Sequence, residues 1–175
     1  MRDNVRRQMH SVFPSLLFTH LFNIFSPSIC RKIIIDKRKN YHALVTAAKK
    51  AKLKAYAPYS NFRVGAAIRT KRGRVYTGCN IENSSYGLTI CAERTAIFKA
   101  ISEGEREFTA IAVASDDPDF CPPCGACRQV LMDLAPHINF VMINKKGQEK
   151  VVTLSELFPY PFGPDHLPRK RKHSS

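Results

Sequence analysis

The sequence lacks long apolar runs, internal repeats and low-complexity segments. No apolar run in its 175 residues approaches the roughly 20 residues needed to cross a bilayer, so we expect no membrane-spanning helix. Acidic residues are scarce too, with 14 Asp and Glu against 28 Lys and Arg. The hydrophobic share of 44% and the charged share of 24% are ordinary for a soluble globular protein. The length fits one domain with short appendages.

The net charge of +14 suggests a nucleic-acid-binding protein until the charges are mapped along the chain. Residues 1–40 carry +6 and the last ten residues carry +4, which leaves +4 for the 125 residues between them. Basic tails bind polyanions weakly, whereas reading a nucleic-acid sequence needs contacts to the bases as well. We therefore predict a domain over 41–167, an N-terminal extension over 1–40 and a basic C-terminal tail over 168–175.

The two ends have alternative interpretations. Arg2, Arg6 and Arg7 precede a largely apolar stretch at 12–25, which resembles a targeting peptide, but no A-x-A-like cleavage site follows it. An unstructured extension, or a start codon placed too far upstream, would also fit. The tail resembles a nuclear-import signal, although basic tails are usually just solvated. We expect a cytoplasmic protein, with a nuclear or organellar location as the alternative.

Helical and strand patterns alternate through the central region. Helix-spaced apolar residues predict helices over 42–55, 91–103 and 124–134, and Thr153 and Glu156 form a capping box that opens a short final helix. Strand patterns occur at 62–68, 74–79, 109–115, 138–144 and 150–152. Because helices alternate with strands after an initial hairpin, we predict an α/β fold with a mixed sheet covered on both faces.

Clustered cysteines favour a metal site over disulfides. Cys124 and Cys127 are three residues apart, so on a helix they share one face, and Cys91 supplies a third thiolate from the start of another helix. A closed structural zinc usually takes four ligands from two Cys-x-x-Cys pairs, whereas here one strong pair meets a single cysteine and an acid, which favours a catalytic zinc with an open position for water. Cys121 could be a fourth ligand, but Pro122 and Pro123 deny it a helical conformation, and we expect it to take no part.

Glu93 follows Cys91 by two residues, close enough to touch a metal-bound water without binding the metal. A carboxylate there can take a proton from the water and pass it to the substrate. The alternative is a solvated glutamate that stabilises the helix start. Arg94 could offset the charge of the thiolates, or it could be a surface arginine.

These residues resemble a known signature. Cys91-Ala-Glu93 followed by Pro123-Cys-Gly-Ala-Cys127 resembles the zinc deaminase motif in its three-cysteine form. The likeness extends over about 41–167, to the homotetrameric zinc-dependent cytidine deaminases that act on free pyrimidine nucleosides. Further matching segments are Ala57-Pro-Tyr-Ser60, Val64-Gly-Ala66, Gly78-Cys-Asn-Ile-Glu-Asn83, Cys124-Gly-Ala-Cys-Arg-Gln-Val130 and Phe162-Gly-Pro164.

The resemblance implies a three-layer α/β/α fold with a five-stranded mixed sheet, and a Zn²⁺ ion bound by Cys91, Cys124 and Cys127. It implies that Glu93 shuttles protons to N3 and to the departing amine, and that Arg94 donates hydrogen bonds to the ligand thiolates. The implied activity is hydrolysis of cytidine and deoxycytidine to uridine and deoxyuridine plus ammonia, a step of pyrimidine salvage.

The resemblance also implies how the nucleoside is held. Asn80 and Glu82 would hydrogen-bond the ribose 3′-hydroxyl, and their alternate positions at a strand end would let them face the same way. Without that context they would be two polar loop residues, and Phe62 could equally be a core residue. Tyr86 and Phe162 would serve sites shared between subunits of the homotetramer. The substrate-binding residues implied in this way are Phe62, Asn80, Glu82, Tyr86, Ala92 and Phe162.

Three alternatives stay open. A polynucleotide cytosine deaminase uses the same metal chemistry, but such enzymes typically have a histidine as first ligand and need a strand-binding groove. A deaminase of a cytosine-containing antibiotic is a second alternative, and a non-catalytic zinc-stabilised binding module is a third. The nearly balanced charge of the central region favours a small nucleoside substrate, with no specific nucleic-acid partner.

Overall fold

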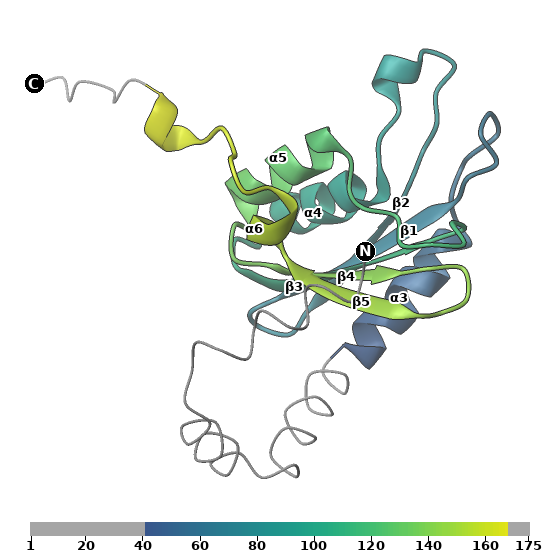
Figure 1. Ribbon diagram of the computed structural model, residues 1–175, viewed down its shortest axis with the longest axis horizontal. Coiled ribbons are helices and arrows are strands. Elements are labelled where there is room, and N and C mark those ends of the chain that lie inside the picture. Colours follow the sequence, from purple (N-terminus) through teal and green to yellow (C-terminus); the bar gives the residue numbers. More distant parts are fainter. Residues whose placement is uncertain (1–40, 168–175) are drawn as a thin grey trace, which may run out of the picture. The chain divides into compact units, whose positions relative to one another are not determined.

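A computed structural model describes residues 41–167, so the predictions for 1–40 and 168–175 lie outside the described residues. A five-stranded sheet stands between helices, as predicted (Figure 1). No helix within 41–167 is long and apolar enough to cross a membrane. The elements are α3 (His42–Lys52), β1 (Val64–Thr70), β2 (Val75–Cys79), the 3₁₀ helix η1 (Tyr86–Leu88), α4 (Ala92–Ser102), β3 (Phe108–Ser115), α5 (Gly125–Leu134), β4 (Asn139–Ile143), β5 (Glu149–Thr153), α6 (Leu154–Leu157) and the 3₁₀ helix η2 (Pro164–His166).

The sheet has the strand order β2-β1-β3-β4-β5. β1 pairs antiparallel with both β2 and β3, and β5 pairs antiparallel with β4. β3 and β4 are parallel, with Val113 opposite Met142, because α5 carries the chain back across the sheet between them. The prediction of a mixed sheet built from a hairpin and a later crossover is therefore confirmed.

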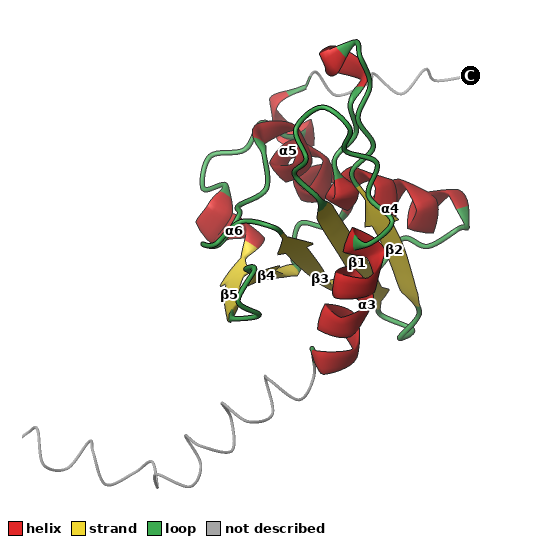
Figure 2. Cartoon of the chain, turned by 90° about the vertical axis from the view of Figure 1, so that its right-hand side faces the viewer, coloured by secondary structure: helices red, strands yellow, loops and turns green. Residues whose placement is uncertain are grey.

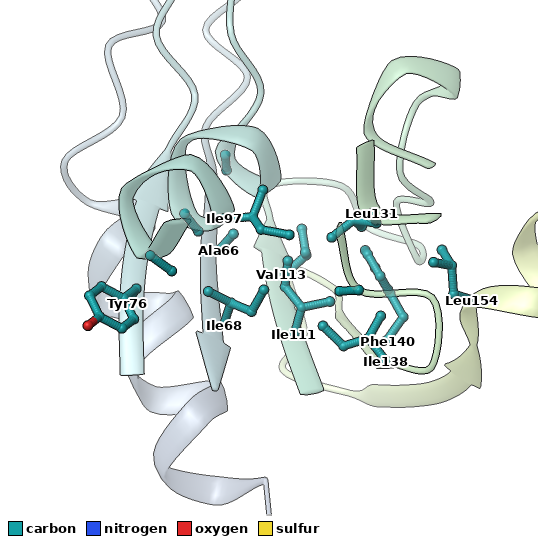
Figure 3. Close-up of a cluster of buried hydrophobic side chains, with 14 of the residues drawn as sticks. Ala66, Ile68, Tyr76, Ile97, Ile111, Val113, Leu131, Ile138, Phe140 and Leu154 are labelled. Carbon is teal, nitrogen blue, oxygen red and sulfur yellow. The ribbon is translucent and has the colours of Figure 1, made fainter. Parts of the chain in front are cut away.

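Each face of the sheet packs against its own helices (Figure 2). Alternate strand residues point to opposite faces, so Ile111 and Val113 of β3 join the cluster under α4, α5 and α6, whereas Ala112 and Ala114 pack under α3. Figure 3 shows the larger cluster, in which Phe140 is fully buried. Burying a side chain of that kind contributes roughly 1.5–3 kcal/mol.

Two glycines allow helices to lie directly against the strands. A Cβ on Gly78 of β2 would stand 2.4 Å from the backbone nitrogen of Ala96 in α4. A Cβ on Gly65 of β1 would stand 2.1 Å from the backbone nitrogen of Lys52 in α3. Contacts this short with backbone atoms cannot be relieved by turning a side chain. Glycine at these two positions therefore sets how close α4 and α3 come to the sheet.

The first helix is shorter than predicted. The sequence pattern predicts a helix to residue 55, but α3 ends at Lys52. The next residues make i→i−3 hydrogen bonds, in which the amides of Leu53 and Lys54 donate to the carbonyls of Lys50 and Ala51. Such tighter turns commonly finish a helix. Because they continue the apolar spacing of the helix, the sequence pattern predicts an end three residues too late.

Candidate active site

Cys91 and Cys124 were predicted to be the first residues of two helices, but in the structure each lies directly before its helix. Cys91 is the N-cap of α4 (φ −77°, ψ 155°) and Cys124 is the N-cap of α5 (φ −65°, ψ 166°). Both have extended backbones, so each helix begins one residue later than predicted. An N-cap side chain lies beside the unpaired N–H groups and the positive end of its helix. Those groups favour a thiolate over a thiol.

Three sulfur atoms converge at these helix starts. The Sγ atoms of Cys91, Cys124 and Cys127 all lie within 4.8 Å of one another, and those of Cys91 and Cys124 are 3.7 Å apart. Tetrahedral zinc with Zn–S bonds of about 2.3 Å requires a sulfur–sulfur separation of about 3.8 Å. The three thiols therefore fit a zinc ion and leave its fourth position open. Within residues 41–167 this is the one cluster of its kind, and Cys121 lies outside it.

Hydrogen bonds among the thiols and to Arg94 shift the pKa values of Cys91 and Cys127 in opposite directions. A hydrogen bond from the Cys127 thiol, helped by Arg94, lowers the pKa of Cys91 to about 5. The same hydrogen bond, together with burial, raises the pKa of Cys127. Arg94 places Nη2 3.8 Å from the Cys91 Sγ and 3.1 Å from the Thr89 carbonyl oxygen. Its Nε is buried and meets no acceptor in the described part of the chain, and an orphaned cationic donor beside sulfur atoms fits a thiolate metal centre.

Glu93 lies in the first turn of α4 with only 5% of its surface exposed. This burial does not fit a solvated glutamate, which was the alternative interpretation. Burial, reinforced by the negative charge on Cys91, raises the pKa of Glu93 to about 7. A carboxyl group that titrates near neutrality can both accept and release a proton under physiological conditions.

A hollow of about 190 Å³ brings Cys91, Cys124 and Glu93 together with three of the six residues predicted to bind substrate, which are Phe62, Asn80 and Ala92. Asn80 is buried in its wall, where its Oδ1 accepts from the Val64 amide and its Nδ2 donates to the Phe62 carbonyl, both at 2.8 Å. One amide hydrogen of Asn80 is left for a ligand. The lining residues are Phe62, Val64, Asn80, Thr89, Ile90, Cys91, Ala92, Glu93, Val113, Cys121, Pro122 and Cys124.

Glu82 lines a separate hollow of about 310 Å³, together with Tyr59, Ser60, Tyr86 and Thr89. Its carboxylate accepts hydrogen bonds from the backbone amides of Tyr59 (2.9 Å) and Ser60 (3.2 Å) and from the Ser60 hydroxyl. The Ser60 hydroxyl is the main cause that lowers the pKa of Glu82. Since β2 ends before Asn80, the argument from strand alternation does not apply to Asn80 and Glu82. Their side chains line two hollows that share Thr89.

The two aromatic residues predicted to act between subunits are exposed. Tyr86 belongs to η1, in the loop that projects above the helices in Figure 1, and 74% of its surface is exposed. Its ring packs edge-to-face on Tyr59, with centroids 6.0 Å apart. Phe162 is 56% exposed, stacks on His166 and lines neither hollow. Within one chain, the structure does not bring Phe162 to the thiol cluster.

Sequence reasoning missed the position of two site residues. Thr89 lines both hollows and its carbonyl oxygen accepts from Arg94, but a single threonine in a loop has no pattern that marks it. Cys121 stays outside the sulfur cluster as predicted, yet it lines the hollow beside Cys91 and Cys124. The two prolines indicate that Cys121 lies outside the helix, but no sequence pattern marks it as part of the wall.

Comparisons with known proteins agree with this geometry. The family described as the cytidine and deoxycytidylate deaminase zinc-binding region matches residues 38–143. A cytidine deaminase of Halalkalibacterium halodurans is 53% identical over 120 residues, which are 68% of this chain and 91% of the relative. A blasticidin-S deaminase of Bacillus cereus is 41% identical over 104 residues, covering 55% of this chain and 74% of the relative. The crystal structure of a cytidine deaminase from Burkholderia pseudomallei superposes with a TM-score of 0.68 at 52% identity, over 70% of this chain and 98% of the other.

Proposed function

The chain belongs to the family of zinc-binding cytidine and deoxycytidylate deaminases, and from this premise we propose that it hydrolyses cytidine and deoxycytidine to uridine and deoxyuridine with release of ammonia. The predictions of the family, of a deaminase enzyme and of zinc as its cofactor are confirmed by the match. The observation that carries the proposal is a cluster of three thiols, two of which line a single hollow together with one buried carboxyl group.

Cys91, Cys124 and Cys127 would hold the zinc ion. Bound there, zinc supplies a water molecule acidic enough to react as hydroxide at neutral pH. The N–H groups at the starts of α4 and α5 and the guanidinium of Arg94 beside Cys91 would help to offset the negative charge of the sulfur ligands.

Glu93 moves the protons of the reaction. Its carboxylate accepts a proton from the attacking water while the water oxygen bonds to C4 of the cytosine ring, and it delivers that proton to N3. The second proton of the water then passes through Glu93 to the exocyclic amine. The C4–N bond breaks, ammonia leaves and C4 retains the oxygen as a carbonyl, so cytidine and water become uridine and ammonia.

The neighbouring residues would hold the nucleoside. Phe62 offers its ring to the pyrimidine, and the backbone at Ala92 offers hydrogen-bonding groups to the edge of the base. The remaining amide hydrogen of Asn80 and the carboxylate of Glu82 would bind the ribose 3′-hydroxyl across Thr89. Tyr86 and Phe162 would complete the sites of neighbouring subunits in a homotetramer, which the exposure of both rings favours. Light scattering that gives one mass four times that of the chain would support this assembly.

The domain limits remain a proposal as well: a catalytic domain over 41–167, an extension over 1–40 and a tail over 168–175. We propose a cytoplasmic location, because thiolate ligands need a reducing compartment. The intact mass of the protein purified from its source would show whether the extension is present in the mature chain.

A second candidate substrate is a cytosine-containing antibiotic, since one relative at 41% identity is named a blasticidin-S deaminase. The test compares the initial rates of ammonia release from cytidine, deoxycytidine, blasticidin S and a cytosine-containing single-stranded oligonucleotide. We expect turnover of the two nucleosides and none in the Glu93→Gln variant. Turnover of the antibiotic alone would favour the second candidate, and turnover of the oligonucleotide alone would overturn both.

A further inference from the structure

A larger hollow, of about 470 Å³, lies on the other side of the sheet from the thiol cluster. Its floor includes Ala114 and Ile143, which belong to the cluster packed under α3. Its walls come from the last turns of α3 and from the β4–β5 turn, which both lie at the right of Figure 1. We call it the lysine pocket, lined by Thr46, Lys49, Lys50, Lys52, Leu53, Ala114, Ser115, Ile143, Asn144, Lys145, Lys146 and Gly147.

Among the residues at 41–167 that line the pocket, lysine is the only charged type. Lys52 is neutralised, because its Nζ lies 2.7 Å from the Asp116 carboxylate and also donates to the Ser115 carbonyl. Among the residues that the structure describes, no ion pair is present for the other four lysines. α3 contains no acidic residue, so the usual i,i+4 pairs with lysine are missing. The pocket therefore presents four positive charges.

The negative end of α3 accounts for part of this charge. Lysines in the last turn of a helix stabilise the unpaired carbonyl groups there, and this explains Lys49 and Lys50. It does not explain Lys145 and Lys146, which lie on a different element. Lys49 Nζ lies 3.5 Å from the place where a Cβ on Gly147 would stand, so the positive groups of the helix reach the turn that carries the other two lysines. Ammonium groups that line the same pocket repel one another, and an anion bound between them would relieve this repulsion.

The turn that carries Lys145 and Lys146 is held in place from several sides. The side chain of buried Asn144 accepts from the Gln148 amide at 2.9 Å and donates to the Pro118 carbonyl at 3.2 Å. The backbone amide of Lys145 donates to the Asp117 carbonyl at 2.8 Å. Because the backbone of this turn is fixed before any ligand arrives, binding needs ordering of the lysine side chains but not of the turn that carries two of them.

We propose that the lysine pocket binds small anions that carry two or more phosphate groups, such as a nucleoside triphosphate or an inorganic polyphosphate. Its volume lies within the range of small-molecule sites, and lysine ammonium groups are common phosphate ligands. The site is separate from the proposed substrate site, since cytidine is uncharged and the thiol hollow opens on the other face. The proposal therefore goes beyond the proposed function and does not depend on it.

The test is calorimetric titration of the full chain with inorganic tripolyphosphate at moderate salt. We expect one saturable site in the wild type. The double variant Lys145→Ala/Lys146→Ala should bind about tenfold more weakly, because two of the four charges are gone. The matched control is Lys71→Ala/Arg72→Ala, which removes two charges from the β1–β2 turn, where Gly73 (φ +85°) has the same place and conformation as Gly147 (φ +79°). The control should bind within twofold of the wild type.

Further titrations separate the possible sources of the anion. ATP that binds more tightly than tripolyphosphate would indicate a nucleotide ligand, and equal binding would indicate recognition of the phosphate chain alone. Orthophosphate that binds as tightly as tripolyphosphate would contradict the need for two phosphate groups.

Two further results would overturn the proposal. One is equal weakening in both double variants, because the binding would then follow net charge, including that of the chain ends. The other is tight binding of a single-stranded oligonucleotide that needs Lys145 and Lys146 while tripolyphosphate does not bind, which would indicate a nucleic-acid surface. Hydrogen exchange adds a local readout, since slowing at 49–53 and 144–147 is expected only if the pocket is the site. The Glu93→Gln variant should bind the anion normally, so failure of the deaminase proposal would not affect this test.

Discussion

On one side of the sheet, the starts of α4 and α5 lie at a group of thiols. On the other side, the end of α3 lies at a group of lysines. A strand glycine lets a helix backbone lie directly on the sheet on each side: Gly78 under α4 and Gly65 under α3. The end of the helix that faces the hollow differs. The positive start of a helix stabilises thiolates, and the negative end stabilises ammonium groups, so the chemistry of each hollow matches the helix end beside it.

Removing one thiol should have the largest effect, and only on the side of the sheet that holds the thiols. In Cys127→Ala we expect zinc to be lost and deamination to fall by more than about 10⁴-fold, since both the activation of water and its placement disappear. Zinc content by mass spectrometry and turnover of cytidine provide the measurement. Lys145→Ala/Lys146→Ala, on the other side of the sheet, is the control and should keep full zinc and full activity. Normal turnover in Cys127→Ala would contradict the assignment of the site.

Glu93→Gln should have the next largest effect. We expect a fall in kcat of about 10³-fold or more, because an amide cannot accept and return the proton. Zinc content should stay at the wild-type level, since the three sulfur ligands are untouched. A non-catalytic zinc-stabilised binding module would instead keep both zinc and function in this variant, so the assay separates the two interpretations.

Adding one methyl group at each strand glycine compares the two sides directly. Gly78→Ala and Gly65→Ala should each lower the stability of the fold by about 1–3 kcal/mol, because α4 or α3 must move away from the sheet. Only Gly78→Ala should also lower kcat at temperatures where both variants are folded, since α4 carries Cys91 and Glu93 at its start. Thermal unfolding and steady-state rates would show this, and equal loss of kcat in both variants would contradict it.

Asp116 gives the smallest predicted effect, in the pH dependence of stability. Burial alone would raise the pKa of Asp116, but hydrogen bonds and charges from Lys52 and Arg63 outweigh burial and lower it. The folded protein therefore binds fewer protons here than the unfolded chain, and the stabilisation present above the unfolded pKa is lost as the pH falls through the folded pKa.

Asp116→Asn should thus lose less stability than the wild type between about pH 5 and pH 3, with a difference of less than about 1 kcal/mol. Urea unfolding across this range is the measurement. Glu107→Gln removes the exposed pair with Lys71 and is the control, since its effect should be smaller still. An identical pH dependence in Asp116→Asn and the wild type would show that the contacts to Lys52 and Arg63 contribute nothing.

The sequence predicts one side of the molecule much better than the other. Cys91, Glu93 and the Cys124–Cys127 pair are close in sequence to helix starts, so spacing alone was enough to predict a zinc site with a nearby acid. The strands follow from short runs of β-branched and apolar residues, which alternate with polar residues in β2 and are almost continuous in the buried strands β3 and β4. Local patterns of this kind predict helices and strands, and the two cysteine segments at 91–93 and 123–127 predict the zinc site.

Long-range placement could not be predicted in the same way. Lys49 and Lys145 come together only because β1, β3 and β4 set the distance between α3 and the β4–β5 turn, and no periodicity records that distance. The hydrogen bonds that tie Asn80 to the Phe62 loop, and the place of Thr89 between two hollows, likewise depend on how irregular segments fold back.

The central strand β3 has a further consequence for how the protein must fold. Val113 lines the hollow of the thiols, and the next residue, Ala114, lines the lysine pocket. A slip of β3 by a single residue against β1 and β4 would turn every side chain to the opposite face and exchange these two walls. Both hollows therefore exist in only one alignment of the strands, and a misaligned sheet would spoil catalysis and anion binding at the same moment.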